Sequence, residues 1–206
     1  MIVVGLTGSI GMGKSALARQ IRALKIPVHE SDRAVHKLLG LGGKAVKPVA
    51  KRFPAAFKNN AIDRKILGRI VFADAQARRD LEKILHPLVR ADSKEFIKLN
   101  RLKGSKIAVL DIPLLFETRQ MRRFDHIICV TAPQFVQKRR VLSRPNMTES
   151  RLRAILKLQI PDAIKRRRAD TVINTGAGYQ SSLAAVKKLL KRLRAGEEGN
   201  AKDERR

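Results

Sequence analysis

The sequence is poor in aromatic residues, cysteine and long apolar runs, and each shortage excludes a class of protein. Tryptophan is absent and aromatic residues make up 4% of the 206 residues, so few side chains could stack on nucleic-acid bases. The single cysteine, Cys129, cannot form a disulfide within the chain, which fits a reducing compartment and a packing role in the core. No apolar run approaches the roughly 18 residues that a membrane-spanning helix needs.

Acidic residues are also scarce relative to basic ones. The 45 Lys and Arg residues outnumber 18 Asp and Glu residues, which gives a formal net charge of +27 and predicts acidic partners such as phosphate esters or nucleic acid. The hydrophobic fraction of 44% is sufficient for the core of one domain. Gly5 and Gly8 interrupt the N-terminal apolar run, so we expect no signal peptide, no membrane association and a cytoplasmic location.

Residues 8–15 (GSIGMGKS) fit the pattern of a phosphate-binding P-loop. The apolar run at 2–7 predicts a buried strand before them, and apolar residues at helical spacing over 17–24 predict a helix after them. Glycines let backbone N–H groups approach an anion, and the helix N-terminus adds partial positive charge. Lys14 could reach the outer phosphates of a nucleotide, and the Ser15 hydroxyl could bind magnesium. The alternative is an ordinary glycine-rich turn, which the complete pattern and its flanks disfavour.

Acidic residues are expected at the carboxyl ends of two strands, where ligands bind in parallel α/β sheets. Glu30 and Asp32 lie at the C-terminal end of a predicted strand at 27–30, and a carboxylate there could orient or deprotonate a hydroxyl group or hold metal-bound water. Asp32 could equally cap the helix that follows it. Asp111 ends a predicted strand at 106–112 and could contact magnesium through water, or only bond to neighbouring backbone.

The segment between these strands is expected to be helical. Residues 40–61 are interpreted as a loop with short helical pieces, and three helices are expected to follow, over residues 62–73, from an N-cap at Asp74 to His86, and from Pro87 to Leu99. The break at His86 is predicted because a residue before proline disfavours the helical region. We interpret residues 33–100 as a helical lobe beside the sheet.

The second half of the chain predicts a basic lid and the rest of the sheet. Arginines concentrate in residues 138–168, as a helix, a turn at Pro145 and a second helix that starts at Thr148. Arginine binds phosphate through two N–H groups, so this segment could close over a nucleotide, although part of it could be a solvated basic face. Strands at 125–130 and 169–176 and a helix at 179–194 follow the same alternation.

Five strands alternating with helices predict a mostly parallel sheet in a three-layer α/β/α fold, with the P-loop strand at its centre. We expect a single domain over residues 1–194, with a lid at about 134–168. Residues 195–206 are predicted to form a disordered, charged tail.

Several blocks of the sequence resemble the dephospho-CoA kinase family, over about residues 1–193. The blocks are residues 5–15, 27–32, 85–90, 111–117, 137–148 and 168–173. Many families share the P-loop, but HPLVR at 86–90 and DIPLLFE at 111–117, in this order and spacing, are far more specific.

The resemblance implies a P-loop nucleoside-kinase-like fold with a helical CoA-binding lobe and a lid. It also implies transfer of the γ-phosphate of ATP, with Mg²⁺, to the ribose 3′-hydroxyl of dephospho-CoA. By resemblance, the expected catalytic residues are Asp32, Lys14 and Arg144, and the residues that bind ATP are Gly11, Met12, Gly13, Lys14, Ser15, Ala16 and Arg140. In the same way, the acceptor would bind at Asp32, His86, Arg90 and Leu114, and magnesium at Ser15 and, through water, Asp111. His86 could equally form a hydrogen bond at a helix end.

Two positions depart from the family pattern. Glu30 stands where the first acid of an Asp-x-Asp motif is expected, and Ala16 replaces a threonine, from which we expect a modest loss of ATP affinity. Two other functions stay open: a kinase of another nucleoside or small alcohol, and a nucleic-acid-binding protein that uses nucleotide as a switch. Dispersed basic residues and few aromatics weigh against the second. We therefore expect no specific nucleic-acid partner, and a monomer.

Overall fold

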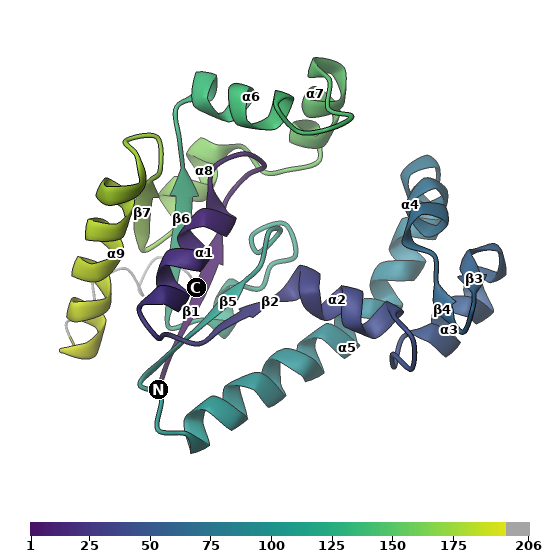
Figure 1. Ribbon diagram of the computed structural model, residues 1–206, viewed down its shortest axis with the longest axis horizontal. Coiled ribbons are helices and arrows are strands. Elements are labelled where there is room, and N and C mark those ends of the chain that lie inside the picture. The colour runs from purple at the N-terminus through teal and green to yellow at the C-terminus, as the bar shows by residue number, and fades with distance from the viewer. Residues whose placement is uncertain (197–206) are drawn as a thin grey trace. The chain divides into compact units, whose positions relative to one another are not determined.

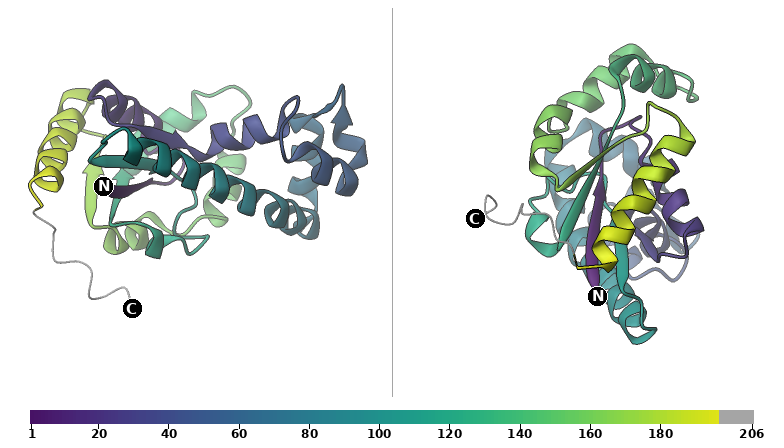
Figure 2. Two further views of the ribbon diagram at one scale, coloured as in Figure 1. Left: turned by 90° about the horizontal axis from the view of Figure 1, so that it is seen from below. Right: turned by 90° about the vertical axis from the view of Figure 1, so that its left-hand side faces the viewer.

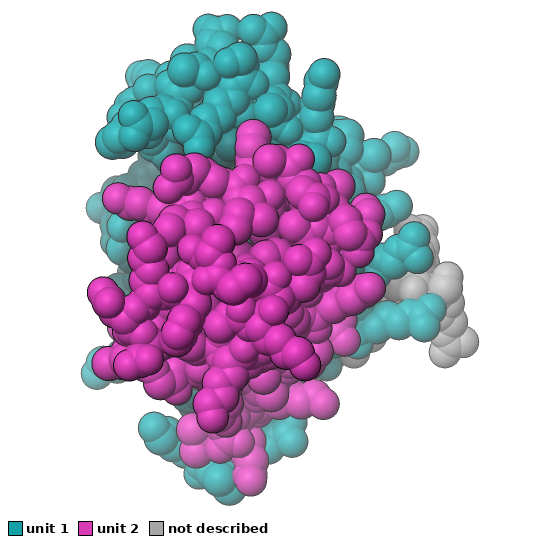
Figure 3. All heavy atoms as spheres, turned by 90° about the vertical axis from the view of Figure 1, so that its right-hand side faces the viewer, with its two compact units in different colours: residues 1–28, 100–206 teal, residues 29–99 magenta. Residues whose placement is uncertain are grey.

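The computed structural model describes residues 1–196, and the chain forms two compact units that Figure 3 colours separately. The first unit comprises residues 1–28 and the chain from Asn100, and the second comprises residues 29–99. Of the tail predicted to be disordered, Ala195 and Gly196 form a turn after the last helix, and residues 197–206 lie outside the described part.

A five-stranded parallel sheet is the framework of the first unit (Figure 1). Its strands, in spatial order, are β2 (Val28–Glu30), β5 (Ile107–Asp111), β1 (Ile2–Thr7), β6 (His126–Thr131) and β7 (Thr171–Asn174). Strands β1, β5 and β6 are nearly continuous apolar runs because parallel strands are buried on both faces. All five predicted strands are confirmed, and the P-loop strand β1 is central as expected. Leu6 pairs with Asp111 of β5 and with Ile128 of β6, so the carboxyl ends of β1 and β5 lie side by side.

Helices cover both faces of this sheet, which confirms the three-layer α/β/α fold (Figures 1 and 2). Helices α1 (Lys14–Ala23) and α9 (Tyr179–Arg194) lie on one face, and their apolar residues form one core with alternate strand residues. Helix α8 (Asp162–Arg168) packs on β6. Helices α6 (Gln134–Leu142) and α7 (Glu149–Lys157) lie between β6 and α8 in sequence, and a 3₁₀ turn, η2 (Met121–Arg123), precedes β6.

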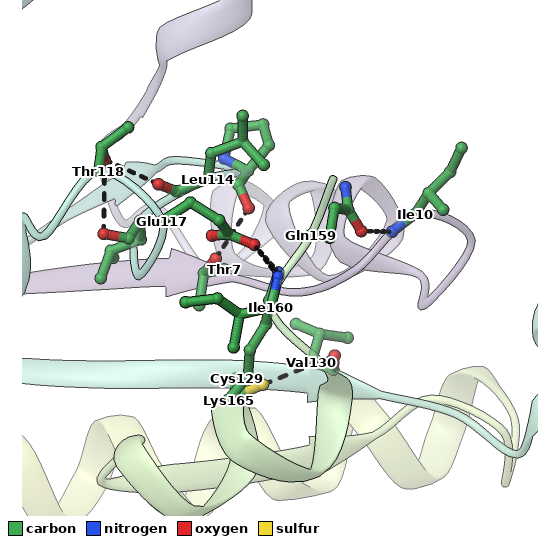
Figure 4. Close-up of polar contacts among 12 residues, drawn as sticks. Thr7, Ile10, Leu114, Glu117, Thr118, Cys129, Val130, Gln159, Ile160 and Lys165 are labelled. Atoms are coloured by element: carbon green, nitrogen blue, oxygen red, sulfur yellow. Dashed lines mark hydrogen bonds and ion pairs between the residues drawn. The ribbon is translucent and has the colours of Figure 1, made fainter. Parts of the chain in front are cut away.

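Cys129 lies on β6 next to α8, fully buried, which confirms its predicted packing role (Figure 4). Burial raises the pKa of its thiol to about 12, and the carboxylate of Asp162 acts in the same direction. Because only the thiolate is reactive, we expect native protein at pH 8 to leave an aromatic disulfide reagent unreacted while urea-unfolded protein reacts fully. Rapid reaction of the native protein would contradict this placement.

The second unit is helical and has a hydrophobic core of its own. Its elements are α2 (Ser31–Leu39), α3 (Val46–Arg52), η1 (Pro54–Ala56), the strands β3 (Phe57–Lys58) and β4 (Ala61–Ile62), α4 (Arg64–Ala73) and α5 (Ala75–Leu102). The last three residues of α5 belong to the first unit. The hydrophobic core of the second unit includes Leu38, Val49, Phe53, Leu67 and Leu85. Within residues 1–196, no helix combines the length and the apolar composition needed to cross a bilayer.

One expectation for this unit is wrong, and a second is incomplete. The helix predicted to break at His86 continues through Pro87 as the 28-residue α5. Proline removes one helical hydrogen bond, and the packing of neighbouring apolar residues such as Leu85 against the core outweighs that loss. Residues 40–61 contain, besides short helical pieces, the antiparallel hairpin β3–β4, whose turn residues Asn59 and Asn60 adopt positive φ of 48° and 57°. Each strand has two residues, which is too short for an alternating pattern.

Candidate active site

The predicted P-loop lies between β1 and α1, the strand–loop–helix context that the sequence indicated. Gly11 and Gly13 have φ of +77° and +88°, a region that glycine adopts without strain. A Cβ atom on Gly13 would lie 2.5 Å from Oγ1 of Thr175, so the loop passes too close to its neighbours for a side chain there.

Backbone amides of this loop are available to an anion. Within residues 1–196, the amides of Gly11 and Gly13 have no backbone acceptor, and those of Lys14 and Ser15 lie in the first turn of α1, where amides have no partner within the helix. The amide of Met12 is used internally, because it donates to the carbonyl of Ser9 at 3.2 Å. Unpartnered N–H groups at the start of a helix form a site for phosphate.

Lys14 and Asp111 meet at the carboxyl end of β1 and β5. The Nζ atom of Lys14 forms an ion pair with Oδ1 of Asp111, and the two side chains are only 14% and 7% exposed. The next residue, Ser15, is exposed. A carboxylate and a hydroxyl suit Mg²⁺, which typically takes one or two protein oxygens and completes its shell with phosphate oxygens and water. No cluster of three or more metal-ligating side chains occurs in the part of the chain that the structure describes.

Arg140 on α6 lies beside Gly13 of the loop. Its two terminal nitrogens donate to Oγ1 of Thr175 at 2.8 Å and to the carbonyl of Thr175 at 2.9 Å. The hydroxyl of Thr175 donates in turn to the carbonyl of Met12 at 2.7 Å. Sequence reasoning missed Thr175, although its place just after a parallel strand was an available signal.

The arginine-rich segment has the predicted helix–turn–helix form. Thr148 caps α7, since its hydroxyl accepts from the amide of Arg151 at 3.2 Å, as predicted. Lys138 and Glu149 join α6 to α7 through an ion pair of 2.6 Å, and the hydrogen bond from Lys138 lowers the pKa of Glu149. Arg144 lies in the connection with an exposed side chain, and among residues 1–196 it is not one of the groups hydrogen-bonded to the P-loop.

The loop after β5 carries Leu114, which is 40% exposed. The hydroxyl of Thr7, the last residue of β1, donates to the carbonyl of Pro113 at 3.2 Å (Figure 4). The hydroxyl of Thr118 donates to the carbonyl of Leu114 at 2.7 Å. The loop is therefore fixed to the strand that precedes the P-loop.

Asp32, His86 and Arg90 belong to the second unit. Asp32 is an exposed residue in the first turn of α2, and the N-cap position is Glu30, so the capping role considered for Asp32 is wrong. His86 is half-buried and Arg90 is exposed, four residues apart on α5, so their side chains lie on the same side of the helix.

A partly buried contact within the second unit holds the segment that leads to Asp32. Nε2 of His29 lies 2.7 Å from Oδ2 of Asp92, and the His29 ring lies 5.3 Å from the Phe96 ring. These contacts join the end of β2 to α5. No sequence pattern signalled this pairing.

Comparisons with known proteins agree with this arrangement. A family model described as dephospho-CoA kinase matches residues 2–180. A dephospho-CoA kinase of Mesorhizobium japonicum is 50% identical over 194 residues, which is 94% of this chain and 98% of that protein. The dephospho-CoA kinase of Rhizobium meliloti is 44% identical over 196 residues, covering 95% of this chain and 100% of that protein.

Solved structures give the same result. A protein of Thermus thermophilus aligns with a TM-score of 0.80 at 33% identity, covering 93% of this chain and 97% of that one. The dephospho-CoA kinase from Campylobacter jejuni aligns with a TM-score of 0.73 at 26% identity, covering 95% of this chain and 98% of that one. A shikimate kinase from Bacteroides thetaiotaomicron, with a TM-score of 0.52 at 16% identity, shares only the fold. With a family model and relatives that match nearly its whole length, the chain belongs to the dephospho-CoA kinase family.

Proposed function

We propose that the protein transfers the γ-phosphoryl group of ATP to the ribose 3′-hydroxyl of dephospho-CoA, which gives CoA and ADP in the last step of CoA synthesis. The observation that carries this proposal is the loop of unpartnered amides whose lysine, Lys14, is already paired with Asp111. A strand–loop–helix of this kind binds the phosphates of a nucleotide. Membership of the dephospho-CoA kinase family identifies the acceptor.

The nucleotide side of the site is assigned to the P-loop and to α6. The amides of Gly11, Gly13, Lys14 and Ser15 would surround the β- and γ-phosphates, and Lys14 would exchange Asp111 for phosphate oxygens. Arg140, held beside Gly13 by Thr175, would also contact phosphate. Bound Mg²⁺ would neutralise charge that develops on the phosphates, with the hydroxyl of Ser15 as ligand and Asp111 in contact through water.

The acceptor side is assigned to Asp32, together with His86, Arg90 and Leu114. The 3′-hydroxyl oxygen would form a bond to the γ-phosphorus as the bond from that phosphorus to the β,γ-bridging oxygen breaks. Asp32 would orient the hydroxyl and accept its proton, and ADP would leave. Arg144, from the lid, would stabilise the negative charge of the transferring group.

Larger regions receive roles by the same proposal. Residues 33–100 would act as the helical lobe that binds the acceptor, and residues 134–168 as the lid, both within a single kinase domain spanning residues 1–194. We further propose a cytoplasmic, monomeric enzyme without a specific nucleic-acid partner.

An acceptor screen tests the function. Purified protein would be incubated with ATP, Mg²⁺ and either dephospho-CoA, adenosine, shikimate or gluconate, and ADP release would be followed by a coupled assay. We expect ADP release above background only with dephospho-CoA, and phosphorus NMR should place the new phosphate on the 3′-oxygen. Preferred phosphorylation of another acceptor would overturn the substrate assignment.

Substituting Ala16→Thr is expected to lower KM for ATP about two- to fivefold with little change in kcat. The amide of Ala16 already donates to the carbonyl of Gly13 at 3.0 Å, and its methyl side chain has no donor. A threonine hydroxyl at this position would therefore add a hydrogen-bond donor for phosphate. Steady-state kinetics at saturating dephospho-CoA measures the effect. The matched control is Ala16→Val, which adds similar volume without the hydroxyl. A higher KM for ATP in the threonine variant, or an equal gain in the valine variant, would refute this role.

A further inference from the structure

A buried ion pair between helix α8 and the loop after β5 has no role in the chemistry described above. Lys165 on α8 has no exposed surface, and its Nζ lies 2.7 Å from Oε1 of Glu117, whose side chain is 13% exposed. Glu117 belongs to the loop that follows β5 and Asp111. The pair therefore joins that loop to α8, within the first unit.

Glu117 also fixes the segment between α7 and α8. Its Oε1 atom accepts a hydrogen bond from the amide of Ile160 at 2.9 Å (Figure 4). The preceding residue, Gln159, reaches the P-loop, where its Oε1 accepts from the amide of Ile10 at 3.2 Å. The position of the Gln159 side chain on the P-loop thus depends on the backbone that Glu117 holds.

The backbone of Ile10 is bonded on both sides. While Gln159 accepts from its amide, Nε2 of Gln137 on α6 donates to its carbonyl at 2.7 Å. Ile10 directly precedes Gly11, whose amide has no backbone acceptor. Two glutamines from the lid segment therefore fix the peptide groups just before the phosphate-binding part of the loop.

Several buried polar atoms of this ion pair and its surroundings lack hydrogen-bond partners, so a contribution to stability does not by itself explain the pair. Within residues 1–196, three buried side-chain atoms near the pair have no hydrogen-bond partner: Oε2 of Glu117, Nζ of Lys165 and Oδ1 of Asp162. In the described part of the chain, Nζ of Lys165 has an ion pair with Glu117 but no hydrogen-bond partner of good geometry. Burying two charges is costly, and apolar residues of similar volume are often equally or more stabilising in such places. What the pair adds is a fixed position for the segment that carries Gln159.

We propose that Glu117 and Lys165 are positioning residues of the nucleotide site, which act through Gln159. Together with Gln137, Gln159 holds Ile10 so that the amides of the following residues keep the arrangement that binds phosphate. The inference rests on the proposed function only in taking an adenine nucleotide as the ligand.

The first test replaces Gln159 by methionine, which keeps the length of the side chain and removes the acceptor. Binding of ADP with Mg²⁺ is measured by calorimetry, and thermal unfolding is followed without nucleotide. We expect a Kd for ADP about five- to tenfold higher, a KM for ATP raised similarly, an unchanged KM for dephospho-CoA and nearly unchanged thermal stability. The matched control is Gln180→Met on α9, an exposed glutamine far along the chain, which should bind ADP like the wild type.

The second test separates positioning from stability. The double variant Glu117→Leu with Lys165→Met replaces the buried charges by apolar groups, so it is expected to keep the thermal stability of the wild type approximately. Its affinity for ADP should nevertheless fall about five- to tenfold, because the Ile160 amide and hence Gln159 lose their anchor. If the double variant does not fold, the Gln159→Met and Gln137→Met variants, which keep the ion pair, decide whether the two glutamines position the loop.

Wild-type affinity for ADP in a folded double variant, or in Gln159→Met, would overturn the proposal. Tighter binding in Gln159→Met would also overturn it, because Gln159 would then compete with the nucleotide for the Ile10 amide. These readouts need no acceptor. A wild-type protein that binds ADP and does not phosphorylate dephospho-CoA would therefore refute the proposed acceptor and leave this inference standing.

Discussion

Lys14→Ala is expected to reduce kcat/KM for phosphoryl transfer by about 10³-fold or more while the protein stays folded. The ammonium group of Lys14 is the cation of the P-loop, and preorganised charges that stabilise a transferring phosphoryl group contribute effects of this size. The substitution also removes the ion pair that Asp111 forms with Lys14 at the end of β5. A coupled assay with varied ATP at saturating dephospho-CoA measures the loss.

Two further variants make this prediction specific. Lys14→Met keeps the aliphatic stem and should lose as much activity, which would assign the effect to the charge. Lys188→Ala removes one positive charge from an exposed position on α9 and should retain normal kinetics. Circular dichroism and thermal unfolding confirm the fold of each variant. Turnover within tenfold of wild type in Lys14→Met would remove Lys14 from the mechanism.

Asp32→Asn is expected to lower kcat about 10²- to 10⁴-fold, with small changes in both KM values. Asparagine has nearly the same shape and can still accept a hydrogen bond, but it cannot take the proton of the acceptor hydroxyl. Because Asp32 is exposed and is not the N-cap of α2, the loss of its charge costs only the weak interaction with the helix dipole. Steady-state kinetics and thermal unfolding of the same preparation test both statements.

A matched acidic control accompanies this variant. Glu82→Gln removes an exposed carboxylate from α5 in the same unit and should leave kcat unchanged. Near-normal turnover in Asp32→Asn would exclude Asp32 as base. A large drop in thermal stability would instead assign to Asp32 a structural role that its exposure does not suggest.

The sheet was predictable because its strands are marked by local patterns. The strand at 2–7 is an apolar run that the P-loop follows directly. The alternation of strands and helices then predicted a parallel sheet with this strand at its centre. The second unit was less predictable. Pro87 is a strong local signal against helix, and packing of α5 outweighs it. The hairpin at 57–62 was missed because its strands have two residues each.

The candidate site was predictable where its residues belong to a local sequence pattern. Gly11, Gly13 and Lys14 are fixed by a contiguous motif, and the structure gives them the conformation that the motif predicts. Thr175 and Gln159 carry no local signal of comparable strength. Their roles depend on hydrogen bonds to the P-loop from segments that are distant in sequence.

The sequence by itself determined the anion-binding loop, the five strands and the family, because motif and periodicity are properties of neighbouring residues. Only the tertiary structure decided which groups meet the loop. Asp111 is 97 residues from Lys14, Gln159 is 149 residues from Ile10, and Thr175 is 163 residues from Met12. Contacts over such separations depend on sheet register and on the path of the chain between strands, and a local pattern specifies neither.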